Sequence, residues 1–338
     1  MAKKKVLLLV DMNEEPPKDH DYSKLLRTEI WSNEKQILKS LERLGYDAKM
    51  FGLFEDISPL LDELKQDPPD VVFNSCEAFR DDRKLEPNIV AAIELFGIPV
   101  TGAPSLGLQL CKDKGLTKKI LSYHGIRVPE FVVSHRASPI RSLKQFSYPA
   151  FIKPLGGEAS EGIAQLSFAE TEKACLDRVH FIHEKLQTDA IIEEFIDGRE
   201  LYVSVMGNSQ LTVFPPREIF FTKKPKEEPR FTSYKAKWDD DYRKRWGIRW
   251  GPARKIDEQI MKELITVSKT IYRLFHLQGY GRIDLRLKES GELYFLEANP
   301  NPSLCQDDEF PSSARLGGLP FDAMIDRIVH LATLKRSS

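Results

Sequence analysis

The sequence predicts an α/β protein in which an N-terminal doubly wound, Rossmann-like domain is followed by a two-part α+β region. Three observations predict this class. Apolar runs of strand length alternate with helical repeats in the N-terminal third, shorter strands then surround one long helix, and a charged strand pair lies near the C-terminus. A chain of 338 residues is long enough for two or three domains that share a cleft.

The N-terminal third reads as parallel strands joined by helices. Residues 5–11 form a continuous apolar run typical of a buried strand, and residues 29–44 carry apolar side chains at helical spacing until Gly45 ends the helix. The same order recurs, with strands predicted over 46–51, 71–73 and 98–101 and helices over 58–65 and 86–96. This alternation predicts a parallel sheet in a domain over 1–112.

The rest of the chain divides into two α+β units. After a helix over 106–123, the first unit, over 113–196, is predicted to contain strands over 127–133, 150–153 and 190–195 and a helix over 170–185. The second unit, over 197–338, is predicted to contain longer strands, a charged stretch over 222–245, a helix over 257–276, the charged strand pair and a last helix near 321–334.

The charge balance excludes some classes of partner. With 50 basic and 51 acidic residues, the net charge of -1 creates no long-range field that would collect nucleic acid or anionic lipid. The apolar run near the N-terminus, over 6–10, is too short for a signal peptide or a membrane span. The four cysteines lie far apart, as in proteins of a reducing compartment: Cys76, Cys111, Cys175 and Cys305. We therefore expect a cytoplasmic protein with neither a nucleic-acid nor a membrane partner.

The charged strand pair has a patterned face. The strand 282–287 alternates polar and apolar residues, so Asp284 shares one face with two arginines, and Glu297 and Asn299 share a face of the partner strand. A two-residue turn at 290–291 and an unbulged antiparallel register would place Asp284 opposite Glu297, and the first arginine opposite Asn299. Two carboxylates are then predicted to face each other.

Facing carboxylates predict a metal site. Like charges directly across a strand pair are destabilising, and a buried carboxylate without a partner would be neutralised, whereas a bound cation removes this conflict. Carboxylate oxygens with a side-chain amide suit Mg²⁺, so Asp284, Glu297 and Asn299 are the predicted ligands. The alternative is an exposed hairpin whose acidic residues are solvated or paired with Arg282 and Arg286.

A glycine-rich segment follows the strand that contains Lys153. Gly156 and Gly157 allow backbone N–H groups to approach a phosphate, and Ser160 can donate a hydroxyl hydrogen bond. Neither a Walker P-loop nor a GxGxxG fingerprint is present. The alternative is an ordinary turn between two strands.

Residues 191–200 combine apolar and acidic positions where the two α+β units join. An adenine ring needs apolar walls, its amino group needs an acceptor such as Glu193 or a backbone carbonyl, and a ribose diol needs a carboxylate such as Glu200. The alternative is an amphipathic strand followed by a turn.

The charged stretch over 222–245 has no clear periodicity. Loops of this length in compact domains are usually lids or disordered. Its segment 234–238, Tyr-Lys-Ala-Lys-Trp, is expected to close over the site, where Lys237 would stabilise a transferring phosphate. A solvated surface loop is the alternative.

Together and in this order, these segments resemble the ATP-grasp superfamily, and within it the D-alanine–D-alanine ligase family. The resemblance covers nearly the whole chain and is strongest from Cys111 to Ala314. It implies an ATP-grasp fold for the two α+β units, and it implies that ATP is bound with two Mg²⁺ ions, or with Mn²⁺ in their place. Gly281-Arg-Ile-Asp284 and Glu297-Ala-Asn299 look like the family's metal-binding pair.

The resemblance also implies the residues of the site. Lys114 and Lys118 lie in a segment similar to the one that bears the first phosphate lysine of the family. Arg282, which stands in the place of the arginine that stabilises a tetrahedral intermediate, and Lys237 are the implied catalytic residues. The implied ATP contacts are Lys114, Lys153, Gly156, Gly157, Ser160, Glu193, Glu194, Phe195, Ile196, Glu200, Lys237 and Phe295.

The implied reaction joins a small-molecule carboxylate to an amine, both from amino acids or peptides. ATP phosphorylates the carboxylate, and the amine attacks the acyl phosphate to give an amide. Proteins that this chain resembles are commonly homodimers. Two other functions stay open: an ATP-dependent kinase that stops at the phosphorylated small molecule, and a nucleotide-binding protein without catalysis.

The chain departs from the family where the family binds its substrates. Residues 11–17 lack the glycine-rich loop and its glutamate, and residues 74–77, Asn-Ser-Cys-Glu, replace a His-Gly segment. After the metal ligands, Asp307, Asp308 and Glu309 stand near positions where the family has a glycine and a serine. These carboxylates predict a cationic or amine-bearing acceptor, with a solvated acidic turn as the alternative.

Overall fold

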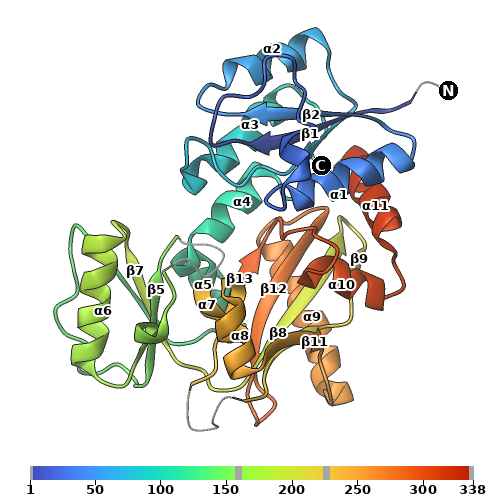
Figure 1. The fold of residues 1–338 in the computed structure, drawn as a ribbon. Helices are drawn as coiled ribbons and strands as arrows, with labels where there is room; N and C mark the ends of the chain where they lie inside the picture. Colours follow the sequence, from blue (N-terminus) through green and yellow to red (C-terminus); the bar gives the residue numbers. More distant parts are fainter. Residues whose placement is uncertain (1–2, 157–161, 224–228, 335–338) are drawn as a thin grey trace.

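The computed structural model describes residues 3–156, 162–223 and 229–334. Three sheets organise these residues, and Figure 1 shows the four-stranded sheet standing apart from the other two. No helix in the described ranges is both long and apolar enough to cross a membrane. None of the four cysteines, all of which lie in the described ranges, forms a disulfide.

The N-terminal sheet is parallel, as the alternation predicted. Strand β1 (Lys5–Asp11) lies between β2 (Asp47–Leu53) and β3 (Val71–Asn74). Its two faces belong to two different buried clusters, because the apolar run alternates between them. The helices of this region are α1 (Ser32–Arg43), α2 (Ser58–Gln66) and α3 (Glu86–Leu95).

Two predicted elements of this region differ in the structure. The segment 98–101 is not a strand but a single parallel bridge between Val72 and Val100, because Pro99 has no N–H to extend the pairing. The helix predicted over 106–123 is two helices, α4 (Ser105–Lys112) and α5 (Lys114–Tyr123). Asp113 is extended between them and accepts a hydrogen bond from the N–H of Leu116, as an N-cap residue does.

The small α+β unit has its own sheet and its own core. Its antiparallel strands run in the order β4-β7-β5-β6, and their bounds are Phe131–Ser134, Ala190–Glu194, Ala150–Pro154 and Phe168–Ala169. The strand predicted over 127–133 is therefore reduced to β4. Helix α6 (Glu172–Lys185) packs on this sheet, and its Val179 and Ile182 lie in the local apolar cluster.

The largest sheet carries the charged strand pair near one edge. Its strands run in the order β11-β10-β8-β12-β13, and β9 also pairs with β8. The bounds are β8 (Arg199–Gly207), β9 (Leu211–Val213), β10 (Arg217–Phe221), β11 (Ile248–Pro252), β12 (Tyr280–Leu287) and β13 (Leu293–Asn299). Helix α9 (Glu258–Leu274) packs its apolar side against one face of this sheet. On the opposite face, α10 (Glu309–Leu316) packs against part of β8, and Asp284 and Arg286 of β12 line a cavity.

The charged stretch over 222–245 is partly helical in its described residues. Helices α7 (Tyr234–Trp238) and α8 (Asp240–Trp246) are each capped, by Ser233 and Asp239. Helix α10 (Glu309–Leu316), which the sequence did not predict, follows the acidic turn, and α11 (Phe321–Thr333) comes last.

The N-terminal domain and the largest sheet are joined by shared apolar clusters. One cluster contains Leu8 of β1 together with Ile325 of α11, and the second contains Leu9 of β1 together with Ile283 of β12. Ser40 Oγ of α1 also donates a 2.7 Å hydrogen bond to Asp322 of α11. The small unit, by contrast, has a separate cluster, so the cleft between it and the rest of the molecule is the natural place for a ligand.

Candidate active site

The strand pair places the two predicted carboxylates opposite each other. Asp284 pairs with Glu297 and Arg282 pairs with Asn299, as predicted. The turn, however, has three residues, 289–291, in which Gly291 adopts a φ of 93° and the Lys288 N–H donates to Glu292 O. A bulge between the carboxylates and the turn restores the register. The predicted two-residue turn and unbulged ladder are both wrong, and the two errors cancel at the carboxylates.

The bulge decides which side chain faces the cleft. Leu285 pairs with Phe295 instead of Leu296, so Leu296 is the extra residue of the bulge. Phe295 is 1% exposed in the core, and its ring centroid lies 5.8 Å from that of Phe275. Leu296 lines a cavity in its place. Phe295 is therefore not a wall of that cavity, contrary to the implied ATP contact.

Asp284 is held by a bidentate ion pair. Arg282 donates from Nε and Nη2 to its two carboxylate oxygens at 2.7 and 2.9 Å, and Asn299 Nδ2 donates to it at 3.1 Å. The pairing with Arg282, which the sequence left as an alternative, therefore occurs, but in a buried site and not on an exposed hairpin. Burial, together with the negative charge of Glu297, raises the pKa of Asp284 to about 6 against the opposing charge of Arg282.

Glu297 has a different electrostatic environment. Burial acts to raise its pKa, but the charges of Lys114, Lys153 and Lys237 outweigh burial and lower the pKa to about 2. Glu297 makes no hydrogen bond or ion pair with another described residue. The carboxylate is thus charged, surrounded by cations and free of a direct partner in the described part of the chain.

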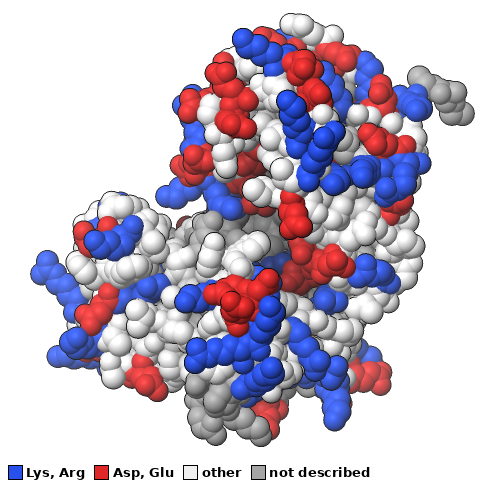
Figure 2. All heavy atoms as spheres, in the orientation of Figure 1, with Lys and Arg blue, Asp and Glu red and all other residues white. Residues whose placement is uncertain are grey.

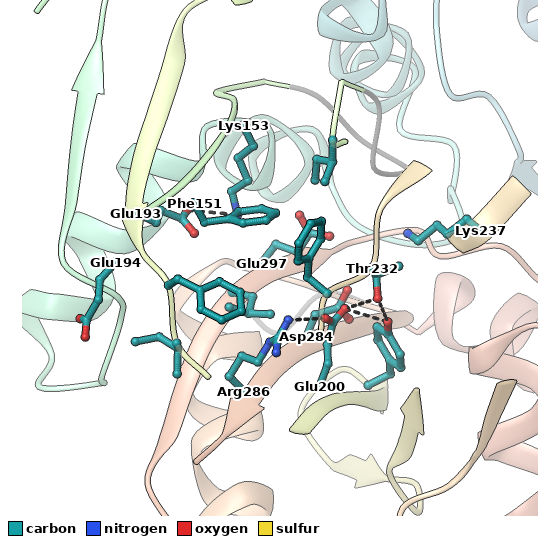
Figure 3. A pocket seen from close by; sticks show the side chains of 16 residues that line it. Phe151, Lys153, Glu193, Glu194, Glu200, Thr232, Lys237, Asp284, Arg286 and Glu297 are labelled. Carbon is teal, nitrogen blue, oxygen red and sulfur yellow. Dashed lines mark hydrogen bonds and ion pairs between the residues drawn. The ribbon is translucent and has the colours of Figure 1, made fainter. Parts of the chain in front are cut away.

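One cavity opens on the Asp284 side of the strand pair, and we call it the aromatic cavity (Figure 3). Its volume is about 70 Å³, and its apolar lining residues are Phe151, Ile163, Phe195, Ile196, Phe231 and Leu296. The rings of Phe151 and Phe231 meet edge to face with centroids 4.9 Å apart. Ligand pockets usually span about 300 Å³ or more, so these rings must move apart before a nucleotide can enter.

Two buried lysines share one glutamate at the wall of this cavity, which Lys153 and Glu193 line. Lys118 Nζ and Lys153 Nζ each lie 3.1 Å from Glu193 Oε1, and Lys118 also donates to Leu296 O at 2.7 Å. Burial lowers the pKa of Lys118 to about 8, although Glu193 opposes this shift. Figure 3 shows Glu193 turned toward Lys153, while Glu194 projects away from it. Glu193, implied as an acceptor for adenine, is therefore already the counter-ion of two cations.

Glu200 also lies in the aromatic cavity with its oxygens engaged. It accepts hydrogen bonds from Tyr202 Oη at 2.8 Å and Thr232 Oγ1 at 2.7 Å, and it forms a 2.9 Å ion pair with Arg286. Figure 3 shows Thr232 and Arg286 converging on its carboxylate. A ribose hydroxyl at Glu200 would have to share these oxygens with three protein donors.

The remaining implied phosphate residues are dispersed. Lys114 lines a second cavity on the far side of Glu297 and not the aromatic one. Lys118, one helical turn later, is the lysine of α5 that reaches Glu193. Gly156 lies beside Lys112, whose carbonyl oxygen is 3.7 Å from where a Cβ would be. Gly157 and Ser160 lie outside the described residues.

Several residues of the aromatic cavity were not predicted. Phe151 lies two residues before Lys153 on β5, so strand alternation could have placed both on one face. Phe231 and Thr232 come from the stretch without periodicity, which offered no signal. Arg286 shares its face with Asp284, but its partner Glu200 comes from another strand.

The second cavity, which we call the polar cavity, lies between the N-terminal domain and the largest sheet. Its volume is about 530 Å³, and it is bounded by the chain from Glu297 to Ser303, by 307–309, and by residues of the N-terminal domain such as Glu77. Figure 2 shows a hollow between these two parts of the molecule, with acidic and basic side chains intermingled on this face. A ligand here would meet groups of both signs.

Helix α7 lies over both cavities. Its Lys237 lines the aromatic cavity and the polar cavity, and the Tyr234 N–H donates to Ile163 O at 3.1 Å. Arg243 of α8 donates to the carbonyl oxygen of Lys237. The segment that the sequence predicted as a lid therefore lies beside both cavities, and its closing movement stays a prediction.

The metal-binding potential of the site depends on few groups. In the described ranges, no cluster of three or more His, Cys, Asp or Glu side chains is arranged to hold a metal ion. Asp284, Glu297 and Asn299 supply two carboxylates and one amide, which is the oxygen-rich set that a hard divalent cation accepts together with water and phosphate.

Comparison with known proteins identifies relatives over most of the chain. A family model described as D-ala D-ala ligase C-terminus matches residues 110–330. The D-alanine–D-alanine ligase of Thermotoga petrophila is 30% identical over 308 residues, which cover 89% of this chain and 91% of that protein. The ligase of Caldicellulosiruptor bescii is 31% identical over 254 residues, covering 72% and 65%.

Solved structures share the fold. D-alanine–D-alanine ligase from Bacillus anthracis complexed with ATP aligns over 97% of both chains with a TM-score of 0.74 and 16% identity. The VanG D-Ala:D-Ser ligase from Enterococcus faecalis aligns over 98% of this chain and 100% of that chain, with a TM-score of 0.70 and 21% identity. The predicted ATP-grasp architecture is thereby confirmed.

Proposed function

Because the chain belongs to the D-alanine–D-alanine ligase family and is an ATP-dependent ligase that forms carbon–nitrogen bonds, we propose that it joins the carboxylate of one amino acid or peptide to the amine of another through an acyl phosphate. One observation carries this proposal. Asp284 and Glu297 face each other where the aromatic and polar cavities meet, and Glu297 lines both. A phosphoryl group could pass there from a nucleotide to a second substrate.

ATP would bind in the aromatic cavity. The rings of Phe151, Phe195 and Phe231 supply apolar surface for adenine, and Lys153 and Lys237 supply positive charge for the phosphates. The triphosphate would extend from these lysines toward Asp284. Because the cavity is closed by its own aromatic rings, binding is expected to follow a movement of the small unit or of those rings.

Magnesium fits the facing carboxylates. Two acidic side chains lie directly across a strand pair, and Glu297 has no direct partner among the described residues. Asp284, Glu297 and Asn299 would hold two Mg²⁺ ions, or Mn²⁺ in their place, by sharing Asp284 with Arg282. When bound, the metal ions neutralise charge on the transferring phosphoryl group.

The reaction has two steps with this chain's residues in fixed roles. In the first, an oxygen of the donor carboxylate attacks the γ-phosphorus of ATP, and ADP leaves. In the second, a neutral amine attacks the acyl carbon, phosphate leaves, and the nitrogen loses a proton. Arg282 would hold the oxygen that becomes negative in the second step, and Lys237 would balance charge on the transferring phosphate.

The helices over 234–246 would exclude water from the acyl phosphate. Lys237 lies at both cavities, and α7 is anchored to Ile163 on the small unit. A closed lid matters because water would hydrolyse the intermediate.

The proposal also includes a cytoplasmic location, a homodimer, and three units over residues 1–112, 113–196 and 197–338. Light scattering of the purified protein would test the homodimer.

A substrate panel tests the function. The purified protein would be incubated with ATP, Mg²⁺ and pairs of amino acids and dipeptides, D-alanine included, and ADP release would be measured alongside mass spectrometry of products. We expect ADP release that depends on both a carboxylate and an amine, and an amide product. A stable phosphorylated product that forms without amine would support a kinase instead. ATP binding without turnover in any mixture would support a non-catalytic role.

A further inference from the structure

Most charged side chains of the polar cavity are compensated within the protein. Arg83 pairs with Glu77 at 2.7 Å, and Glu86 pairs with Lys112 at 2.6 Å. Arg282 pairs with Asp284 and also lies 3.5 Å from Glu309. Charges that the fold has satisfied in this way do not require a ligand. The informative groups are therefore those without a partner.

Arg217 is one such group. It lies on β10, opposite Tyr202 of β8, and it lines the polar cavity while partly buried. Its Nε is buried without a hydrogen-bond partner, and the guanidinium makes no ion pair with any described residue. The charge of Glu309 acts on it, but that carboxylate is paired with Arg282. A partly buried guanidinium without a partner is costly unless a ligand anion compensates it.

Asp308 is the matching group of opposite sign. It occupies the N-cap position of α10, yet its side chain does not cap that helix. Asp113, Asp239 and Asp257 all use the same position to accept a backbone N–H. Asp308 instead bonds to Ser303 and lines the polar cavity, and it forms no ion pair in the described part of the chain.

These two groups define a substrate. We propose that the acceptor is an amino acid with a cationic side chain, whose carboxylate pairs with Arg217 and whose side-chain ammonium pairs with Asp308. Its other amine, in the neutral form, attacks the acyl phosphate. This inference rests on the proposed ligase function and names the class of its second substrate. The cavity volume of about 530 Å³ is large enough for such a molecule beside a donor.

The acceptor preference can be measured with a matched set of amines. With ATP, Mg²⁺ and a fixed panel of donor amino acids, the acceptors would be lysine and ornithine in both configurations, norleucine, lysinamide and cadaverine. Amide formation would be followed by mass spectrometry and acceptor-dependent ADP release. We expect kcat/KM for lysine or ornithine to exceed that for norleucine, which lacks the ammonium, and for lysinamide and cadaverine, which lack the carboxylate, by about tenfold or more.

Two variants assign each preference to its residue. Asp308→Asn should abolish the preference for lysine over norleucine, and Arg217→Gln should abolish the preference for lysine over lysinamide. The exposed pair Asp177 and Lys173 on α6 offers matched controls, because their side chains are 66% and 87% exposed, 3.0 Å apart, and line neither cavity. Asp177→Asn and Lys173→Gln should leave both ratios unchanged. Thermal unfolding and the KM for ATP would verify that each variant is folded.

The outcomes distinguish a failure of this inference from a failure of the proposed ligase function. Equal use of norleucine and lysine by the unaltered protein, or ratios that survive both substitutions, would overturn the inference while the ligase stands. Cadaverine used as well as lysine would remove the role of Arg217. If no acceptor of any class yields an amide, the proposed function fails and the inference fails with it.

Discussion

The aromatic cavity and the polar cavity share Lys237 and Glu297 in their walls but differ in how their charges are compensated. In and behind the aromatic cavity, Glu193 has two lysines and Glu200 has an arginine and two hydroxyls. In the polar cavity, Arg217 and Asp308 have no ion-pair partner among the described residues.

This difference separates two ways of building a binding site. Where most charges are paired by the fold, the geometry is held before the ligand arrives, which suits a ligand common to a whole family such as ATP. Where charges of both signs stay unpaired, the ligand must complete the electrostatics, and the site discriminates between ligands by their charges. The sequence predicts the same contrast, because its segments resemble those that bind ATP in the family, whereas residues 11–17, 74–77 and 307–309 depart from the segments that bind the family's substrates.

The largest effect is expected at the junction of the two cavities. Asp284→Asn and Glu297→Gln should each lower amide formation and ATP turnover about a thousandfold or more, because loss of a proposed metal ligand would remove several kcal/mol of charge stabilisation. Steady-state ADP release measures this. Glu292→Gln, beside the turn of the same hairpin, is the control and should retain activity. Unchanged turnover in either carboxylate variant would show that the metal assignment is wrong.

The next effect is the loss of folding stability when a charged side chain is removed at each of the two cavities. Lys118→Met should lower the free energy of unfolding by about 1–3 kcal/mol, because it removes the contacts of Lys118 with Glu193 and Leu296 O while Lys153 still compensates Glu193. Asp308→Asn should cause no such loss, because the carboxylate has no cationic partner among the described residues. Urea unfolding followed by circular dichroism measures both variants. Equal destabilisation by the two substitutions would contradict the contrast between the cavities.

A smaller effect is expected at the lid. Lys237→Met should lower kcat about a hundredfold, as expected when one preorganised cationic donor is lost, with a smaller change in the KM for ATP. The measurement is initial-rate kinetics over a range of ATP concentrations. Lys235→Met on the same helix is the control, because Lys235 is exposed and lines neither described cavity. A rate equal to that of the control would remove Lys237 from the mechanism.

The smallest effect is a pH dependence of the KM for ATP, which is proposed to bind in the aromatic cavity. Burial lowers the pKa of Lys118 to about 8, so its positive charge is present below this pH and is lost as the pH rises through it. The phosphates would then face one cation fewer, and the KM for ATP should rise about two- to threefold between pH 7 and pH 9. Lys118→Arg should flatten this rise, because arginine stays charged over this pH range. Lys119 is exposed on the same helix, so Lys119→Met is the control and should show the same rise as the unaltered protein. An identical rise in the Arg variant would assign the titration to another group.

The sequence predicted the fold mainly through local periodicity. The parallel sheet at the N-terminus, the position of the small unit and the strand pair near the C-terminus all follow from apolar repeats, and the structure and relatives confirm this architecture. Elements were missed where a single residue overrides the repeat. Pro99 prevents a strand over 98–101, and Asp113 divides the helix predicted over 106–123.

The sequence by itself determined which side chains share a face of each strand in the charged strand pair. Alternation places Asp284 on one face with its arginines, and it places Glu297 and Asn299 on one face of the second strand. These faces are set by neighbours within a few residues along the chain. The pairing of Asp284 with Glu297 also depends on the bulge at Leu296, which offsets the longer turn.

Only the tertiary structure decided which side chains meet across the cleft. The bulge at Leu296 removes Phe295 from the aromatic cavity, and the packing of α5 against β13 brings Lys118, and not Lys114, to Glu193. Whether a charge such as that of Arg217 is paired depends on elements far apart in sequence. Ion pairing and burial are properties of the folded assembly, so no local pattern contains them.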